Sequence, residues 1–417
     1  MKKIEIKKGI NLYLFPEKKF KTYYAGVYFH TPLNADTATE NALLPLVLKR
    51  GSKNYPTKAS ISEKLEMLMG ASFSAYVQKK GESQLLSFSI SGVSDSFAPF
   101  GECFKDGINL LADVALNPII PFDEEYLKSE KQHLSEIIES EKNDKRHYSV
   151  LRCKEEMNKG TPYAVPESGY AGKIEEISPE SLEKRYYDII SSSPVDILVV
   201  GNFDEDSAAG VITACLSRLP ERNCDYPVTT PSLPEDVSTV TEAMAVSQGK
   251  LCIGFTTPVP SAMSEDYAAL TVYNSIFGGG AHSKLFMNVR EKLSLAYYAG
   301  SSYERAKGII IVSSGIESKN FEKARDEIFL QHKAMTDGDI TDTELAVSKK
   351  ALINSLKATG DSVGSIAAFS LSSILQNMTL TREELAERID NVTKEDIVRV
   401  GKNIAPKTIY FLKGADR

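Results

Sequence analysis

Two hydrophobic periodicities alternate along this chain. Apolar residues at every second position predict strands over Ile4–Leu14, Tyr24–Thr31, Ser72–Gln78 and Gln84–Ser91. Between and after these segments, apolar residues recur every three or four positions, which predicts amphipathic helices. Because strands that follow one another across short turns pair antiparallel, we expect mainly antiparallel sheets with helices packed on one face. The pattern therefore predicts an α+β fold.

The same order of elements occurs twice. The stretches "SEKLEMLMGASFSAYVQKKGESQLLSFSISG" and "REKLSLAYYAGSSYERAKGIIIVSSGI" each contain a helix end, a strand, a turn and a second strand, and a long amphipathic helix follows both. Each half also ends in a strand that follows a helix, at Pro194–Asp204 and Lys407–Gly414. An interval of half the chain indicates a duplicated domain rather than an array of short repeats.

The length of the chain supports this division. With 417 residues it exceeds the size of about 250–300 residues at which single cores stop growing. One segment, residues 219–242, carries four prolines and few large apolar residues, which is typical of a linker. We therefore expect an N-terminal domain at 1–218, a linker at 219–242 and a C-terminal domain at 243–417.

Composition narrows the classes of function. The net charge is −7 and no long cluster of Lys and Arg occurs, so nucleic acid is not expected as a partner. No run of about 18 apolar residues occurs, so no membrane span is expected. The N-terminus lacks the pattern of a signal peptide and the five cysteines form no Cys-x-x-Cys motif. These features predict a cytoplasmic protein with reduced cysteines, most of them in the core.

The order of several motifs resembles that of a known family. Two predicted strands and a helix precede the segment "RGSKNYPT". This segment is followed by a helix, the segment "MGASFSAYV", a strand, another helix and the segment "NPIIPFDEEYLKSEKQHLSEIIESEKND". This order resembles the pitrilysin/insulinase family of zinc peptidases, which includes the mitochondrial processing peptidase. The resemblance continues through "GTPYAVPESGYAGKIEE" and "IFGGGAHSKLFMNVREKLSLAYYAG", so it covers most of both halves.

The resemblance implies that the zinc site of the family is degenerate here. In the family, His-x-x-Glu-His on the helix before the Gly-Ser turn supplies two zinc ligands and a general base. Counted back from the turn, these positions are Ala42, Pro45 and Leu46, and the third ligand, a Glu on a later helix, falls at Ile137. None of these side chains binds zinc or transfers a proton. The resemblance therefore implies no metal cofactor in this chain, and zinc only in a partner subunit.

Pro45 also affects the expected shape of this helix. Proline has no backbone N–H, so we expect the helix to start late or to kink at this residue. For the earlier start, Thr37 and Glu40 have the spacing of a capping box.

A replacement metal site is an alternative. The segment "EKQHLSE" places Glu130, His133 and Glu136 three residues apart on one helical face, and a shift of one residue in the register would bring Glu136 to the third ligand position. A face rich in Glu is more often solvated, and catalytic zinc favours several His ligands. Whether these residues bind a metal stays open.

The second half keeps another family signature. In "GGGAHSKLFMNVREKLSLAY", Arg290 and Tyr297 match the Arg/Tyr pair that family members place over the zinc site, where both side chains donate to the peptide and its oxyanion. The three glycines Gly278, Gly279 and Gly280 would let a peptide backbone approach closely. The plainer interpretation makes Arg290 a surface charge, Tyr297 a core residue and the glycines an ordinary turn.

Our leading hypothesis is a non-metal-binding subunit of a heterodimeric zinc peptidase, active only with a homologous zinc-binding partner. It would bind the peptide substrate and stabilise the oxyanion. The alternative is a catalytically inactive peptide-binding or scaffold protein of the same fold. Whether the isolated chain forms a homodimer stays open, as does the identity of the substrate.

Overall fold

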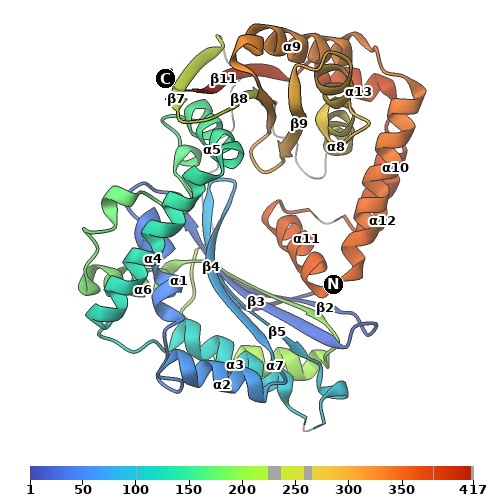
Figure 1. Ribbon diagram of the computed structural model, residues 1–417. Helices are drawn as coiled ribbons and strands as arrows, with labels where there is room; N and C mark the ends of the chain where they lie inside the picture. Colours follow the sequence, from blue (N-terminus) through green and yellow to red (C-terminus); the bar gives the residue numbers. More distant parts are fainter. Residues whose placement is uncertain (100, 224–235, 258–264, 379, 415–417) are drawn as a thin grey trace. The chain divides into compact units, whose positions relative to one another are not determined.

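A computed structural model describes residues 1–99, 101–223, 236–257, 265–378 and 380–414. The chain forms two compact units, each made of three segments (Figure 1). Unit 1 contains Met1–Glu139, Val165–Val228 and Gly360–Leu371, and unit 2 contains Ser140–Ala164, Thr229–Thr359 and Ser372–Arg417. None of the described helices is long and apolar enough to span a membrane.

Unit 1 is built on a six-stranded sheet. Its strands are β1 (Lys2–Lys7), β2 (Ile10–Pro16), β3 (Thr22–Pro32), β4 (Ser72–Lys80), β5 (Ser83–Val93) and β6 (Val195–Gly201), in the order β1-β2-β6-β3-β5-β4. All neighbours are antiparallel except β2 and β6. The single strand predicted over Ile4–Leu14 is wrong: Gly9, with a φ of 79°, turns the chain between β1 and β2.

The helices of unit 1 pack on one face of this sheet. They are α1 (Ala38–Leu48), α2 (Lys58–Met67), α3 (Cys103–Leu116), α4 (Glu124–Asn143), α6 (Pro179–Ser192) and α7 (Glu205–Leu216). Alternate residues of each central strand, such as Ala25, Val27 and Phe29 of β3, share one core with residues from these helices. The period of two is the one the sequence predicted.

Unit 2 contains a five-stranded sheet. Its strands are β7 (Ser238–Met244), β8 (Gly249–Thr256), β9 (Ala296–Glu304), β10 (Ile309–Ile316) and β11 (Ala405–Gly414), in the order β7-β11-β8-β10-β9. Only β7 and β11 are parallel neighbours. Strands β6 and β11 are the two closing strands that the sequence predicted. The α+β class and the mainly antiparallel pairing are thus confirmed in both units.

The helices of unit 2 include one, over residues 145–157, that lies within the predicted N-terminal domain 1–218. The elements are α5 (Lys145–Met157), α8 (Glu265–Gly278), a π-helical segment η4 (Phe286–Lys292), α9 (Phe321–Asp337), α10 (Asp342–Ala358), α12 (Arg382–Asp390) and α13 (Lys394–Gly401). A further helix, α11 (Val363–Leu375), crosses the boundary between the units. On one face of the sheet, Phe255 of β8 contacts rings of α8 and α9. On the other face, Cys252 shares a core with Cys153 and Met157 of α5.

The predicted linker stays a prediction. Residues 224–235 of the segment 219–242 lie outside the described residues, and strand β7 begins inside this segment at Ser238. The boundaries at 218 and 243 therefore remain predictions. The two units exchange segments of the chain: residues 140–164 belong to unit 2, and residues 360–371 belong to unit 1.

The described cysteines are free thiols, and most of them are buried.

Candidate functional site

Helix α1 runs through Pro45 without a late start. It begins at Ala38 and ends at Leu48, so Pro45 lies in its last turn. There, proline removes only the N–H that would bond to the carbonyl of Asn41. The predicted capping box is wrong, because the Thr37 side chain makes no capping hydrogen bond. Its backbone, with a φ of −114° and a ψ of −12°, is not in the extended conformation typical of an N-cap.

The four positions of the family's zinc chemistry are packed as apolar contacts. Ala42 and Pro45 are buried, while Leu46 and Ile137 are half-buried. Ala42 belongs to the core of unit 1, and Leu46 packs against that core. Among the residues that the structure describes, no group of three or more His, Cys, Asp or Glu side chains could hold a metal ion. The donor set at these positions does not fit zinc, and no step of a reaction here can be derived through a metal held by this chain.

An ion pair links the residue segment just after helix α1 to the second turn of helix α4. The guanidinium of Arg50, just after α1, donates to Oε1 of Glu130 on α4, and the Glu130 side chain is almost fully buried. Lys58 Nζ lies 3.5 Å from the same oxygen, and His133 Nδ1 lies 3.1 Å from Oε2. Burial raises the pKa of Glu130, but the hydrogen bond with His133 and the charge of Arg50 outweigh it, so the pKa lies below its ordinary value.

These contacts also bear on the alternative metal site. Both oxygens of Glu130 already interact with cationic or imidazole nitrogens. Glu136 accepts a hydrogen bond from Gln132 at 2.9 Å instead of facing Glu130. A metal at this face would have to displace Arg50 from a buried carboxylate, which is unfavourable.

Arg290 lies on the π-helical segment η4. Leu293 N donates to the carbonyl of Asn288, five residues earlier, at 3.1 Å, and Ser294 ends the segment with a φ of 50°. The Arg290 guanidinium lies 4.6 Å from the centroid of the Phe286 ring, and Nη1 lies 3.6 Å from Glu291 Oε1. The side chain is 41 % exposed. π-helical turns are rare and are frequent at functional sites.

Tyr297 lies at a β-bulge on the edge strand β9. Tyr298 pairs with Gly315 and Ala296 pairs with Ile316, which leaves Tyr297 as the extra residue between them. Its side chain is 63 % exposed, so the interpretation of Tyr297 as a core residue is wrong. A bulge of this kind redirects a side chain and is often found next to active sites.

The three glycines connect helix α8 to the same strand. A Cβ at Gly278 would lie 2.5 Å from Ser301 N, and one at Gly279 would lie 2.7 Å from Ser275 Cα. The packing of α8 against β9 therefore requires glycine at 278, and the close approach of the chain to the last turns of α8 requires it at 279. The same glycines line one wall of a groove of about 410 Å³, so they also face an open space.

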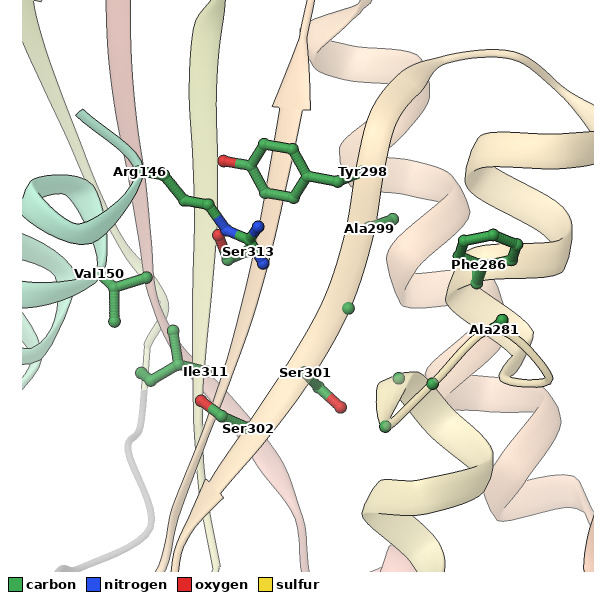
Figure 2. A pocket seen from close by; sticks show the side chains of 14 residues that line it. Arg146, Val150, Ala281, Phe286, Tyr298, Ala299, Ser301, Ser302, Ile311 and Ser313 are labelled. Carbon is green, nitrogen blue, oxygen red and sulfur yellow. The ribbon is translucent and has the colours of Figure 1, made fainter. Parts of the chain in front are cut away.

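This groove extends along the edge strand β9 within unit 2 (Figure 2). Gly278–Ala281 and Phe286 line one side, and Arg146 and Val150 of α5 line the other. Arg290 does not line the groove, but Phe286, on which it stacks, does. Sequence reasoning missed Arg146, because no local pattern indicates that helix α5 belongs to unit 2.

Comparisons with known proteins identify the family. A family model described as the peptidase M16 inactive domain matches residues 176–352. A protein named probable inactive metalloprotease YmfF, from Bacillus subtilis (strain 168), is 35 % identical over 419 residues, which cover 98 % of this chain and 96 % of that protein.

Solved structures agree with this assignment. A conserved protein from Enterococcus faecalis V583 has a TM-score of 0.92 and 30 % identity, and the match covers 100 % of this chain and 99 % of that chain. A peptidase M16 inactive domain from Pseudomonas fluorescens has a TM-score of 0.82 and 19 % identity, over 100 % and 98 % of the two chains, which supports the fold. The chain belongs to the M16 (pitrilysin/insulinase) family of peptidases, with apolar residues at the positions of the family's zinc site.

Proposed function

We propose that this chain is the non-metal-binding subunit of a heterodimeric zinc peptidase in the cytoplasm. A homologous partner chain would supply the His-x-x-Glu-His helix and the zinc ion. One contrast carries the proposal. The zinc positions hold apolar side chains, and Ala42 and Leu46 among them contribute to the core of unit 1. By contrast, the polar side chains of Arg290, on a π-helical segment, and Tyr297, at a bulge, are 41 % and 63 % exposed. This contrast fits a chain that no longer binds zinc but still presents donors to a peptide.

The chemistry of the pair fits its proposed role. Hydrolysis of a peptide bond builds negative charge on the carbonyl oxygen, and a guanidinium and a phenol hydroxyl are donors that can stabilise it. Neither side chain needs a metal of its own for this task. Arg290 Nη1 lies 3.6 Å from Glu291 Oε1, which is too long for a hydrogen bond. The N–H groups of the guanidinium can therefore donate to another acceptor.

The edge strand β9 supports a role in binding peptides. It is the last strand of its sheet, so one row of its N–H and C=O groups has no neighbouring strand among the described residues. An extended peptide can add to such an edge. Gly278, Gly279 and Gly280 line the same groove and would keep its second wall free of side chains.

A second candidate function is a catalytically inactive peptide-binding or scaffold protein. It is favoured by the similarity of this chain to a family model described as an inactive domain and to a Bacillus subtilis protein named a probable inactive metalloprotease. In that case, the exposed Arg290 and Tyr297 would serve only to bind a peptide.

The test separates the two functions. The tagged chain is captured from its native host under mild salt, and the eluate is assayed for peptide cleavage that a zinc chelator abolishes. We expect a homologous zinc-binding chain to co-elute, and Arg290→Ala to slow cleavage by about 10²–10³, as for the loss of one oxyanion donor. Lys292→Ala, which removes a neighbouring exposed charge, serves as the matched control.

Each result has one meaning. Co-elution with a slow Arg290→Ala complex supports the divided active site. Activity that is equal in the wild type, Arg290→Ala and Lys292→Ala contradicts the role of Arg290. Peptide binding with no co-eluting zinc chain and no cleavage favours the inactive peptide-binding protein.

A further inference from the structure

One cation, Arg146, lines the groove along β9, and a second cation, Lys250, lies beside the same tyrosine ring, Tyr298. Arg146 forms no ion pair with any residue that the structure describes, and its guanidinium carbon lies 4.2 Å from the centroid of the Tyr298 ring. Lys250 Nζ lies 5.8 Å from the same ring and donates to an uncharged oxygen of Gln248 at 3.0 Å. By contrast, Arg152 on the same helix pairs with three glutamates. Arg146 is exposed and makes no direct ion pair within the described part of the chain, so its guanidinium is available where it lines the groove.

The position of the Arg146 guanidinium is set by the packing of Tyr298. Tyr298 pairs with Gly315 across the ladder, and a Cβ at Gly315 would lie 2.5 Å from the Tyr298 ring. Glycine at 315 thus lets the ring lie flat against the sheet, and the guanidinium stacks on its outer face (Figure 2). A cation held by stacking keeps its N–H groups available for a ligand.

Two buried hydroxyls at the base of the groove lack hydrogen bonds. The Tyr298 hydroxyl and Ser313 Oγ lie near each other, but neither has a partner with hydrogen-bond geometry among the described residues. Ser313 pairs with Gly300 on β9, so no side chain at 300 separates it from the groove. Burial raises the pKa of Tyr298 to about 12, which keeps its hydroxyl protonated as a donor. Unpaired buried hydroxyls are costly, and a ligand oxygen would satisfy them.

The nearest acidic group is already engaged elsewhere. Asp144 Oδ1 accepts hydrogen bonds from the backbone N–H groups of Arg146 and His147, both at 3.0 Å, at the start of helix α5. It therefore caps the helix instead of pairing with the Arg146 guanidinium. Burial and the charge of Arg146 lower the pKa of Lys250, and the charge of Asp144 offsets part of this effect.

We propose that this groove binds a carboxylate of an extended peptide, with Arg146 as the charged donor and Ser313 and Tyr298 as neutral donors. Lys250, which lies beside the groove, would add positive charge without contacting the ligand. The carboxylate would belong either to the C-terminus of the peptide or to an acidic side chain. This inference rests on the peptide-binding part of the proposed function and names its substrate class. The opposite wall, Gly278–Ala281 with Phe286, would contact the rest of the peptide.

The test measures binding by the purified full-length chain, without any partner. Three fluorescein-labelled octapeptides of alternating Val and Ser are compared by fluorescence anisotropy: one with a free C-terminal carboxylate, one with a C-terminal amide, and one amidated peptide with a central Glu. We expect at least one carboxylate-bearing peptide to bind about 10-fold tighter than the neutral amide, as for a charge-assisted pair. Because the net charge of the chain is −7, general electrostatics would give the opposite order.

Three variants locate the effect. Arg146→Met should reduce the difference between charged and neutral peptides to less than about twofold, and Arg146→Lys should leave part of it. Lys145→Met removes the neighbouring cation of α5, which does not line the groove, and should preserve the full difference. Equal affinities for all three peptides, no binding, or an unchanged difference in a folded Arg146→Met chain would overturn the proposal.

The outcome is separable from that of the proposed function. If the charged peptides bind tighter through Arg146 but the captured complex shows no cleavage, the carboxylate site stands and the peptidase role falls. If the complex cleaves peptides and depends on Arg290 but the isolated chain shows no preference for a carboxylate, the peptidase role stands and this site is rejected.

Discussion

Two regions of this protein, one in each unit, carry the positions that the family resemblance assigns to catalysis, and they differ in side-chain chemistry and burial. Around helix α1 the family's zinc positions are apolar, and the Arg50–Glu130 ion pair joins the neighbouring elements. Around η4 and β9, Arg290 and Tyr297 are exposed. Exposed polar side chains contribute little to stability, so folding does not account for this pair. The first region contributes to the core, whereas the second presents polar groups that, under the proposed function, would contact a peptide.

The largest effect should come from restoring imidazoles to helix α1. Ala42 is 4 % exposed, so Ala42→His with Leu46→His must fit two polar rings into packed space and should lower the free energy of unfolding by about 3 kcal/mol. Urea unfolding with and without zinc measures this. The control is Leu46→His alone, at the half-buried position, which should cost less. A double variant as stable as the wild type and further stabilised by zinc would show that the region is still built for a metal.

A smaller loss should follow removal of the ion pair. Arg50→Met leaves the buried Glu130 with only Lys58 and His133 nearby, and should lower the free energy of unfolding by about 2 kcal/mol. Chemical denaturation at neutral pH is the measurement. Lys58→Met, at a largely exposed side chain, should change stability by less than about 0.5 kcal/mol. Equal effects of the two substitutions would mean that Arg50 is not the main partner.

The same ion pair predicts a dependence on pH. The pKa of Glu130 is lower in the folded state than its ordinary value, so its stabilising effect is present above that ordinary value and is lost as the pH falls through the folded pKa. The difference in unfolding free energy between the wild type and Glu130→Gln should therefore be larger at about pH 7 than at about pH 3. A difference that stays constant across this range would contradict the assignment.

In the second region, the backbone after η4 is strained. Ser294 has a φ of 50°, which is unfavourable for a residue with a Cβ, so Ser294→Gly should stabilise the chain by up to about 1 kcal/mol. Thermal unfolding measures it. Ser247→Gly is the control, because Ser247 is exposed and has no positive φ, and it should not stabilise the chain. Destabilisation by Ser294→Gly would show that the serine side chain has a structural role here.

The smallest change in stability is expected for the pair itself. Arg290→Ala and Tyr297→Phe should each shift the free energy of unfolding by less than about 0.5 kcal/mol, because both side chains are largely exposed. Differential scanning calorimetry of the isolated chain is the measurement. A loss comparable to that of Arg50→Met would place the pair in the scaffold and remove the contrast between the two regions.

Some features of the site were predictable and others were not. The missing zinc ligands at Ala42, Pro45 and Leu46 follow from side-chain identity and from the spacing to the Gly51 turn, which are local properties. The capping box at Thr37 was wrong because its backbone angles, which depend on the packing of the preceding loop, were not those of an N-cap. The groove was invisible in the sequence because Arg146 and Tyr298 are far apart along the chain and meet only on the folded sheet.

The sequence by itself determined the α+β class, the duplication and the two closing strands, and through the family resemblance it predicted the loss of zinc ligands. These depend on hydrophobic period, element order and residue type, all of which are read within short windows. The tertiary structure alone decided that α5 completes unit 2, that Tyr297 is the exposed residue of a bulge, and that Arg146 lies over Tyr298 without an acidic partner. Such features depend on the combined packing of segments distant in sequence, which no local pattern encodes.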